Sequence, residues 1–551
     1  MTPDLRTGSP QVLLIGPYDP HCGEYTFLAP PLGVWRLAGA LQAAGVAARV
    51  FDPNCCDGNP ADVLAATLHQ QPWDIVGVST TGMTLRYDLE LAHLARRILP
   101  KAVIVAGGME ATFQPELMFR LGPFDLVVLG EGEKPLLELA TRVRSGASFE
   151  AIPGTAVLDP QGSVRRHFQS ALSQAELRAA IVQTPYEQMP FSAYWSRLEE
   201  AYRVRALPSK ADREARLAEI RSVRLITLNY CPMGCTFCSS TNFLSAAQGG
   251  TASIARLDVD DCLAMVKRIV SAQPDVRTVI FQDDIFVFTQ DRRILPLCAA
   301  IIDAKRRGEL PQYLQFISTN RIDAMNVERL TAMAGAGFRV LGFGIENFSR
   351  GVLKEFNKSR IYDSIEPQLR LALDLGITPF LDMIMTSPGC TLEDLAETVR
   401  KGYRWLLAGC EMGMYPYVIP FSGAAMANDA SLKPHTEYTL HRIAGTDIEW
   451  DQPAKILPID PLVREAILTI EQRFNGSIAS LETDVAHLPS RLRSLVWVMC
   501  ASAVLAETGA AVPDEDEVRA ELMRRLPGRV GDVVRSDLAQ PAPGPVLIPH
   551  G

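Results

Sequence analysis

Residues 229–243 read NYCPMGCTFCSSTNF and place three cysteines in one short loop. Cys231, Cys235 and Cys238 are separated by three residues and then by two. A structural zinc site needs four protein ligands, and the next histidine along the chain is His435. The same spacing suits a cubane iron–sulfur cluster in which three irons take a thiolate and the fourth stays open. The loop therefore predicts either such a cluster, with a position for a small chelating molecule, or three thiols without a common function.

The cysteine loop stands at the start of a regular series of strand-like segments. VRLITLNY, residues 223–230, leads directly into it. Further apolar segments follow, separated by amphipathic helical patterns: TVIFQDD (278–284), YLQFISTNRID (313–323), FRVLGFGIEN (338–347), ITPFLDMIMTSPG (377–389) and EMGMYPYVIP (411–420). Six strand and helix units in this length predict an open, partial (β/α)6 barrel of the TIM type. Because active sites of such barrels lie at the C-terminal ends of the strands, we expect the cysteine loop at that end.

A different alternation fills the first part of the chain, from residue 11 to about 145. Short β-branched runs alternate there with helical patterns such as residues 32–44 and 85–99. This pattern predicts a doubly wound, Rossmann-like α/β domain with a parallel sheet, whose strands end in Gly, Ser or Thr where a ligand docks. We expect four parts: the Rossmann-like domain at 1–148, a helical linker at 149–220, the partial barrel at 221–428 and a helical C-terminal domain at 429–551.

The composition excludes several classes of protein. The 551 residues carry a formal charge of -9 with a pI near 5.6, so we expect no nucleic acid as a partner. The N-terminus lacks the layout of a signal peptide, and no uncharged apolar run approaches the ~20 residues that span a bilayer, so we expect a cytoplasmic protein without a membrane partner. Cysteines stay reduced in that compartment, and most of the 11 are expected as small buried hydrophobes. The adjacent Cys55 and Cys56 have no assigned role.

The cysteine loop resembles that of the radical S-adenosylmethionine (SAM) enzymes, in which an aromatic residue, here Phe237, precedes the last cysteine. The resemblance implies a [4Fe–4S] cluster on Cys231, Cys235 and Cys238, with the amino and carboxylate groups of SAM on the open iron. It also implies an electron donor such as flavodoxin or ferredoxin as a partner.

Other barrel segments carry positions at which this family contacts SAM. The matching residues are Asp283 or Asp284 for the methionine amino group, Ser318, Asn320 and Arg321 for ribose and carboxylate, and Glu346 for the region of the adenosyl group. The segment MTSPGC keeps Pro388 and Gly389 but lacks the family's common Gly-Leu-Pro-Gly-Glu, so that strand has no assignment. Taken singly, each acid also suits a helix N-cap or a surface salt bridge.

The first domain resembles the cobalamin-binding domain of the cobalamin-dependent branch of the same enzymes. The resemblance rests on residues 29–52, 74–82, 103–116 and 126–139. The positions that match the family's cobalamin contacts are Ser79, Gly107, Gly108, Gly130 and Glu131. His21 stands in DPHCGE, one residue short of the cobalt-ligating motif of other cobalamin proteins, so it is assigned no ligand role. A flavodoxin-like module with another cofactor, or none, is the alternative.

Together the two resemblances imply a cobalamin-dependent radical SAM methyltransferase. The expected reaction moves a methyl group from methylcobalamin to an unactivated carbon or a phosphinate phosphorus of a small-molecule intermediate, as in antibiotic biosynthesis, and its catalytic residues are not assigned. A phosphonate or carboxylate acceptor would need a positively charged side chain near the barrel mouth, such as Arg321 or Arg339. The alternatives are a cobalamin-dependent cyclase or ring-rearranging enzyme and, from another class, a cobalamin-binding sensor with a structural cluster.

Overall fold

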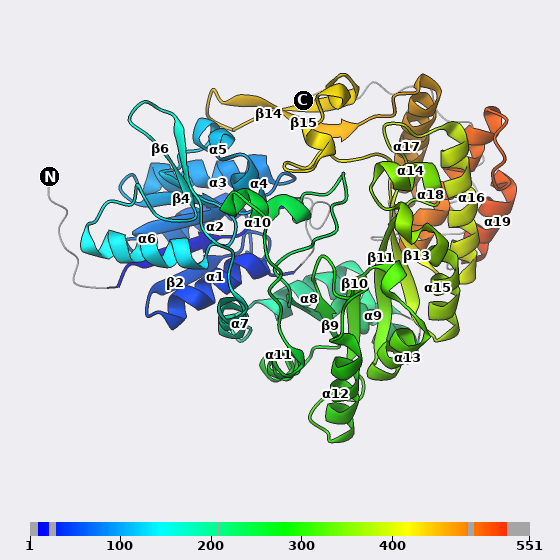
Figure 1. Ribbon diagram of the computed structural model, residues 1–551, viewed down its shortest axis with the longest axis horizontal. Coiled ribbons are helices and arrows are strands. Elements are labelled where there is room, and N and C mark those ends of the chain that lie inside the picture. The colour runs from blue at the N-terminus through cyan, green and yellow to red at the C-terminus, as the bar shows by residue number, and fades with distance from the viewer. Residues whose placement is uncertain (1–8, 21–28, 208, 483–489, 526–551) are drawn as a thin grey trace.

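The computed structural model describes residues 9–20, 29–207, 209–482 and 490–525. Figure 1 shows a first domain on the left, a barrel with its helices on the right, and a hairpin that runs along the top between them. His21 and its cysteine neighbour Cys22 lie outside the described residues.

The first domain is built on a seven-stranded sheet with the order β2-β1-β3-β4-β5-β6-β7. The strands are β1 (Gln11–Ile15), β2 (Ala47–Phe51), β3 (Ile75–Ser79), β4 (Val103–Gly107), β5 (Leu126–Val128), β6 (Thr155–Leu158) and β7 (Val164–His167). The first five strands pair in parallel, and β6 and β7 add antiparallel to the edge.

Helices cover both faces of this sheet because its strands are apolar on both sides. The helices are α1 (Leu32–Ala43), α2 (Pro60–His69), α3 (Leu85–Ile98), α4 (Met109–Phe113), α5 (Pro115–Leu121) and α6 (Glu133–Ser145). On β1, Leu13 and Ile15 join the apolar core that includes α2 and α3. Val12 and Leu14 join the opposite core, which includes α1 and α6. The doubly wound domain predicted from the sequence is confirmed.

Two strands occupy a segment that was predicted to be part of a helical linker. The hairpin of β6 and β7 continues the first sheet as far as His167. It escaped the sequence prediction because it is a short edge hairpin whose outer strand carries Arg165 and Arg166 in place of an apolar run. Charged residues are a common protection of exposed sheet edges, and they erase the alternation that marks a strand. The boundary between the first domain and the linker stays a prediction.

The helical linker follows, with α7 (Gln174–Gln183), α8 (Phe191–Ala201), a 3-10 turn at Val204–Ala206 and α9 (Lys210–Ile220). Two of its tyrosines form hydrogen bonds to the first domain and to the barrel. The Tyr194 hydroxyl donates to Asp52 at 2.8 Å at the end of β2, and the Tyr186 hydroxyl donates to the Arg224 carbonyl at 2.9 Å in the first barrel strand. The linker therefore packs against both domains along its length.

The second sheet has six parallel strands in the order β13-β12-β11-β10-β9-β8. The strands are β8 (Ser222–Leu225), β9 (Thr278–Phe281), β10 (Gln315–Asn320), β11 (Phe338–Glu346), β12 (Thr378–Ile384) and β13 (Glu411–Tyr415). The helices are α10 (Ser240–Gln248), α11 (Val259–Ala272), α12 (Ile294–Arg306), α13 (Val327–Ala336), α14 (Arg350–Glu355), α15 (Tyr362–Asp374) and α16 (Leu392–Ala408). Since β8 and β13 are the two edges of the sheet, the barrel is open, as predicted.

The two faces of the barrel strands differ in burial. On β12, Leu381 and Met383 are fully buried and belong to the same apolar core as the surrounding helices. Phe380, Asp382 and Ile384 alternate with them and are half-buried. The half-buried set therefore lines the concave face of the barrel, where a ligand would lie.

The C-terminal part begins with a hairpin of β14 (Thr436–Arg442) and β15 (Glu449–Ile456), followed by α17 (Pro461–Glu482), α18 (Ser490–Glu507) and α19 (Glu515–Arg525). The helices confirm the predicted helical region, but the hairpin was not predicted. Its strand β14 is exposed along most of its length, so it lacks the apolar face that marks a strand in a sequence.

The hairpin reaches back across the molecule to the first domain (Figure 1). Ile443 and Trp450 are buried and belong to the same apolar core as the residues of α2 and α3 in that domain. The Gln452 side chain donates to the Gly82 carbonyl. Among the described helices, none is long and apolar enough to cross a membrane.

Candidate functional site

The cysteine loop leaves the barrel directly after β8 and is fixed to the next strand by Asp283. The Asp283 carboxylate accepts from the Thr227 backbone N–H at 2.6 Å, the Thr227 hydroxyl at 2.6 Å and the Leu228 N–H at 2.8 Å. Arg293 donates to the same hydroxyl at 3.0 Å. Burial raises the pKa of Asp283 to about 6, against the effect of Arg293 and these hydrogen bonds. Asp283 is therefore occupied in holding the start of the loop.

Asp284 is more open to solvent than its neighbour and accepts fewer hydrogen bonds. Its side chain is exposed to solvent. The Ser240 hydroxyl donates to its carboxylate, and partial desolvation raises the pKa of this group. Cys231 lies close enough for the charge of Asp284 to raise the pKa of its thiol. Of the two acids that the sequence offered, Asp284 is the one open to a ligand beside the cysteine loop.

The three cysteines lie close together, with Cys231 buried and the other two half-buried. Burial, Asp284, Cys238 and Cys235 together raise the pKa of the Cys231 thiol to about 12, against a hydrogen bond from the Met233 backbone. Burial also raises the pKa of Cys235, which Lys358 lowers.

Three cysteines at this sequence spacing suit a cubane cluster, which leaves one corner without a protein ligand. Among the described residues, no three His, Cys, Asp or Glu side chains converge tightly enough to hold one metal ion. In a cubane each thiolate binds a different corner, so the sulfurs need not converge. Phe237, just before the last cysteine, packs edge-on against Phe356 with ring centroids 4.9 Å apart. The donor set and its fixed frame therefore fit an iron–sulfur cluster.

Arg321 lies beside the cysteine loop but is already paired. Its guanidinium makes two bonds to Asp323, at 2.7 and 2.8 Å, and approaches the Met233 sulfur at 3.2 Å. Asp323 raises its pKa, so the group is a fixed cation. Arg339 is the second residue of β11, at the end of the strand remote from the loop, and its side chain is exposed. The structure contradicts the prediction that Arg339 lies near the barrel mouth.

Ser318 and Asn320 are buried and bonded to each other. The Asn320 amide donates to the Ser318 carbonyl at 2.9 Å and to its hydroxyl at 3.0 Å. Ser318 pairs in register with Leu341, which lies in the helix-facing core, whereas Thr319 pairs with Gly342 on the concave face. A contact of Ser318 or Asn320 with SAM stays a prediction that this placement does not favour.

Glu346 ends β11 in the left-handed region, with φ of 67°. Few residues other than glycine adopt this conformation, and it marks a position held by its surroundings. Lys358 donates to the Glu346 carboxylate at 2.7 Å and to the Gly344 carbonyl at 2.5 Å. Both side chains are almost fully buried. Glu346 lies at the same end of the barrel as the cysteines, since its charge raises the pKa of Cys235 and the charge of Lys358 lowers it.

One acidic residue at this site was missed by the sequence reasoning. Asp382 lies on the concave face of β12, and Tyr415 ends β13 with its side chain about half exposed. Burial and Glu346 raise the pKa of Asp382 to about 7, and Lys358 lowers it. The sequence does show an acidic residue within an otherwise apolar strand segment, which could have indicated a site residue. Asp382 matches no position of the resembling family, so it was not assigned.

In the first domain, the C-terminal ends of β3 and β4 form the edge that was predicted to bind cobalamin. Ser79 and Gly107 are half-buried and paired in register. A Cβ atom on Gly107 would meet only Val128, at 3.9 Å, so this glycine borders open space. A Cβ on Gly108, whose φ is 98°, would lie 2.5 Å from the Thr80 carbonyl oxygen. The cradle at Gly107 fits a bulky ligand, whereas Gly108 is explained by the turn alone.

Gly130 and Glu131 make protein contacts. Gly130 has φ of 72°, and a Cβ there would lie 2.5 Å from the Ala247 Cβ of α10. Glu131 is buried, and its carboxylate accepts from the Leu172 N–H at 2.6 Å at the start of the linker. Contact of these two residues with cobalamin therefore stays a prediction.

Three segments meet above the sheet edge and join the two domains. In α4, buried Glu110 accepts from the Ser422 hydroxyl at 2.8 Å. Ser422 lies in the segment that follows β13. The Asn242 amide, in α10, donates to the Gly423 carbonyl at 2.7 Å. A Cβ on Gly423 would overlap the ring of Phe113, so this segment packs tightly on α4.

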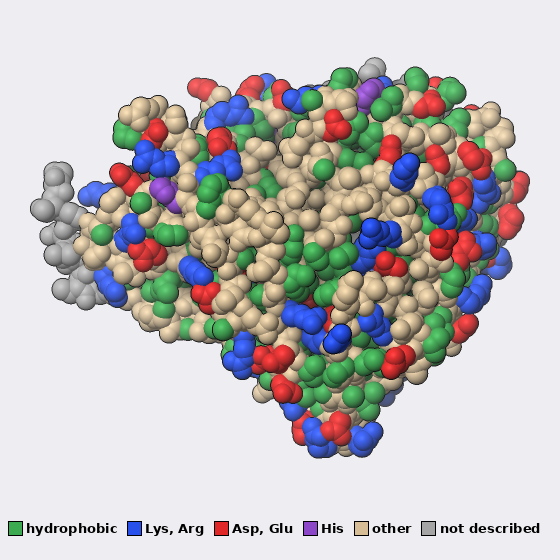
Figure 2. Space-filling model, in the orientation of Figure 1, with side chains coloured by type: hydrophobic (Ala, Val, Ile, Leu, Met, Phe, Trp, Pro, Cys, Tyr) green, Lys and Arg blue, Asp and Glu red, His purple; other side chains and the backbone are tan. Residues whose placement is uncertain are grey.

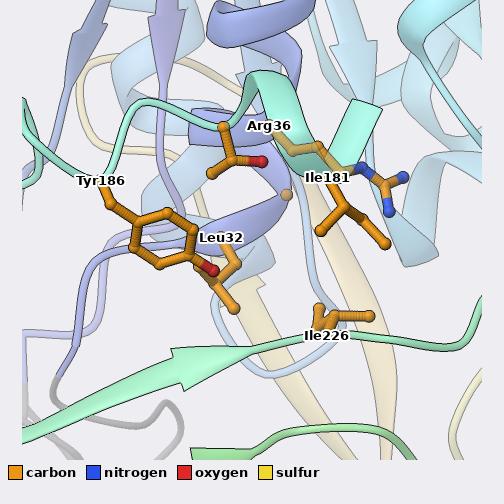
Figure 3. Close-up of a pocket in the computed structure, with 7 residues that line it drawn as sticks. Leu32, Arg36, Ile181, Tyr186 and Ile226 are labelled. Carbon is orange, nitrogen blue, oxygen red and sulfur yellow. The ribbon is translucent and has the colours of Figure 1, made fainter. Parts of the chain in front are cut away.

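A small cavity between the first domain, the linker and β8 is unrelated to this site. It encloses about 20 Å³, enough for about one water molecule. Figure 3 shows its lining: Leu32, Gly33, Arg36, Ile181, Thr184, Tyr186 and Ile226. It is too small for either predicted cofactor. Figure 2 shows instead that hydrophobic side chains gather in the middle of the face, between the first domain and the barrel.

Two family models match the chain, and they match the two domains described above. The B12 binding domain matches residues 20–140, and the Radical SAM superfamily matches residues 225–402. The chain carries a B12-binding domain followed by a radical SAM domain. This combination confirms the predicted pairing of a cobalamin-binding domain with a radical SAM domain. It also confirms the predicted cofactor set of a [4Fe–4S] cluster, SAM and cobalamin, although not the individual contact residues.

Similar proteins share this architecture. An uncharacterised methyltransferase of Pyrococcus horikoshii is 22% identical over 80% of this chain and 85% of its own length. The anaerobic magnesium-protoporphyrin IX monomethyl ester cyclase of Rubrivivax gelatinosus is 25% identical over 75% of this chain and 69% of its own. The radical SAM methyltransferase TsrM of Kitasatospora setae, solved with cobalamin and a [4Fe–4S] cluster, superposes with a TM-score of 0.62 at 17% identity, covering 90% of this chain and 100% of that one. The structural similarity shows a common fold.

Proposed function

We propose that this protein transfers a methyl group from methylcobalamin to an unactivated carbon or a phosphinate phosphorus of a small molecule, as in the making of a natural product. When bound, the cluster and SAM supply a carbon-centred radical, and cobalamin supplies the methyl group. The protein's own task is to hold these groups and the acceptor in one water-excluded space.

One observation carries the proposal: the cysteine loop and the B12-binding domain are joined by α10. The helix begins two residues after Cys238 and ends beside Gly130 in the B12-binding domain. A movement of the cysteine loop is therefore limited by contact with the domain that would hold cobalamin. Such a direct connection suits a reaction in which both cofactors act on one acceptor.

On the radical SAM side, the proposed cluster ligands are Cys231, Cys235 and Cys238. Asp284 would accept hydrogen bonds from the methionine amino group, since it is open and adjacent to the loop. Arg321 would place a fixed positive charge near the SAM carboxylate, and Glu346 would lie near the adenosyl group. An electron donor such as flavodoxin or ferredoxin would reduce the cluster.

On the cobalamin side, Ser79 and Gly107 would border the nucleotide tail. Gly107 leaves open space at the sheet edge, which supports this role. Glu110, Ser422 and Asn242 would keep that edge in place against the barrel.

A cyclase or ring-rearranging enzyme is the second candidate. The Rubrivivax gelatinosus relative is a cyclase and covers three-quarters of this chain. Cyclisation would use the same cofactor sites and would differ in whether the methyl group of SAM appears in the product.

The test begins with metal content after anaerobic purification from cells given cobalamin. We expect about four irons and about one cobalt per chain. Replacing Cys231, Cys235 and Cys238 by Ala is expected to remove the iron and keep the cobalt. The matched control replaces Cys55 and Cys56 by Ala, two half-buried thiols outside the barrel, and should keep both metals.

The second step follows methyl-labelled SAM in the reduced protein with cell extract as the source of acceptor. Label in a small-molecule product supports methyl transfer, whereas an unlabelled rearranged product supports cyclisation. Iron without cobalt would contradict the methylcobalamin proposal. Both metals without 5'-deoxyadenosine after reduction would favour a sensor.

A further inference from the structure

The concave face of the barrel presents one carboxylate that the fold does not use. Asp382 lies in the middle of the half-buried row of β12 and has no hydrogen-bond partner among the described residues. Asp283, by comparison, accepts three hydrogen bonds and lies beside Arg293. A buried carboxylate that serves the fold is normally satisfied in that way.

The neighbours of Asp382 on both adjacent strands are glycines. Gly344 of β11 and Gly413 of β13 pair with it in register. Above Gly344 lie the Glu346 carboxylate and the Lys358 ammonium, since a Cβ there would fall 2.6 and 3.0 Å from them.

The space above Gly413 is bordered by aromatic rings. A Cβ there would make ordinary contacts with Phe380 at 3.5 Å and Tyr415 at 3.8 Å. Asp382 therefore has a charged pair on one side and an aromatic wall on the other.

The charges around Asp382 leave it uncompensated. Lys358 is committed to Glu346 and to the Gly344 carbonyl. Arg321 is committed to Asp323. Arg339 lies at the far end of β11. A partly buried carboxylate without a partner costs stability, and that cost is relieved when a ligand brings a positive charge.

We propose that Asp382 binds a protonated amine on the acceptor, with the Tyr415 ring covering the apolar part beside it. The inference rests on the proposed function, because it places the acceptor on the concave face of the radical SAM domain. Ammonium groups bind well between a carboxylate and an aromatic face. The acceptor is then a small molecule that carries an ammonium group.

The test compares three probes of one shape on the protein loaded with its cofactors and with S-adenosylhomocysteine. Tyramine carries an ammonium group, tyrosol a hydroxyl and 3-(4-hydroxyphenyl)propionate a carboxylate. Calorimetry should show tyramine binding roughly tenfold or more tighter than tyrosol, with the carboxylate weakest. Asp382→Asn should abolish this preference. Asp374→Asn, which removes an exposed carboxylate at the end of α15, should keep it.

Three results would overturn the inference. The natural protein could show no preference for tyramine, or no binding of it, or the preference could survive in Asp382→Asn. In the third, Asp382→Asn loses as much affinity for S-adenosylhomocysteine, measured without any probe, as it loses for tyramine, which would place Asp382 on SAM. The first comparison uses only the natural protein, so it remains a valid test even if Asp382→Asn fails to fold. Iron and cobalt measured on the same samples separate this inference from the proposed function, since a protein with both metals and no amine preference loses only the inference.

Discussion

At the scale of single residues, neighbouring acids in one turn perform different tasks. Asp283 is buried and fixes the cysteine loop, whereas Asp284 is open beside Cys231. The sequence offered both for the same role because it shows which residues follow a strand but not which of two adjacent side chains turns inward.

Replacing these two acids should separate stability from binding. Asp283→Ala leaves the Thr227 and Leu228 N–H groups and the Thr227 hydroxyl without their acceptor and removes the negative charge near Arg293, so we expect a loss of about 3 to 5 kcal/mol in the free energy of unfolding. Asp284→Ala should change that free energy by less than about 0.5 kcal/mol and weaken SAM binding roughly tenfold. Urea unfolding of the apoprotein and calorimetry with S-adenosylhomocysteine measure the two effects. Unchanged SAM affinity in Asp284→Ala would refute its proposed role.

Binding of an amine at Asp382 should depend on pH in one direction. Burial and Glu346 raise the pKa of Asp382 to about 7, against Lys358, while Tyr415 stays neutral because burial raises its pKa. Deprotonation on going from about pH 6 to about pH 8 creates the carboxylate that a protonated amine needs, so tyramine affinity should rise over this range. Calorimetry at several pH values measures it, and Asp382→Asn should flatten the curve. If tyramine affinity falls as the pH rises, Asp382 is not the carboxylate that binds the amine.

At the scale of elements, α10 connects the two cofactor domains, and the glycine opposite it is under two constraints. Gly130 has a left-handed backbone and faces Ala247 closely, whereas Gly107 has neither constraint. The two glycines therefore form a matched pair.

Gly130→Ala should cost about 2 to 4 kcal/mol in the free energy of unfolding, from backbone strain and overpacking. Gly107→Ala should cost less than about 1 kcal/mol but lower the cobalt retained after gel filtration, because its methyl group enters the open space. Urea unfolding and cobalt content measure both. A Gly107→Ala protein with full cobalt content would place cobalamin elsewhere.

The elements that the sequence predicted are those with a strong pattern. The helices expected at 32–44 and 85–99 are α1 and α3, and the barrel strands are apolar on their helix-facing side. The hairpins β6–β7 and β14–β15 were missed because β7 carries Arg165 and Arg166 and β14 is exposed along most of its length, so neither strand shows a clear apolar alternation. Within the site, the cysteine spacing was readable, but the pairing of Ser318 with Asn320 and the isolation of Asp382 depend on which strand face each residue takes.

At the scale of the whole molecule, the β14–β15 hairpin acts as a strap from the barrel to the B12-binding domain (Figure 1). Trp450 is its buried anchor, and Tyr438 on the opposite strand is about half exposed. Trp450→Ala should lower the free energy of unfolding by about 3 to 5 kcal/mol and speed the bleaching of the cluster by oxygen. Tyr438→Ala should change neither. Absorbance decay in air measures the second effect, and equal decay in both variants would show that the strap does not shield the site.

The strap also determines the order in which the protein can be assembled. The B12-binding domain is synthesised first, and the residues that close over it are among the last third of the chain. A ligand as large as a corrinoid then enters most easily while synthesis is still under way. Cells given cobalamin during expression should therefore yield more cobalt per chain than finished apoprotein incubated with it. Equal loading by the two routes would mean that the closed molecule opens readily.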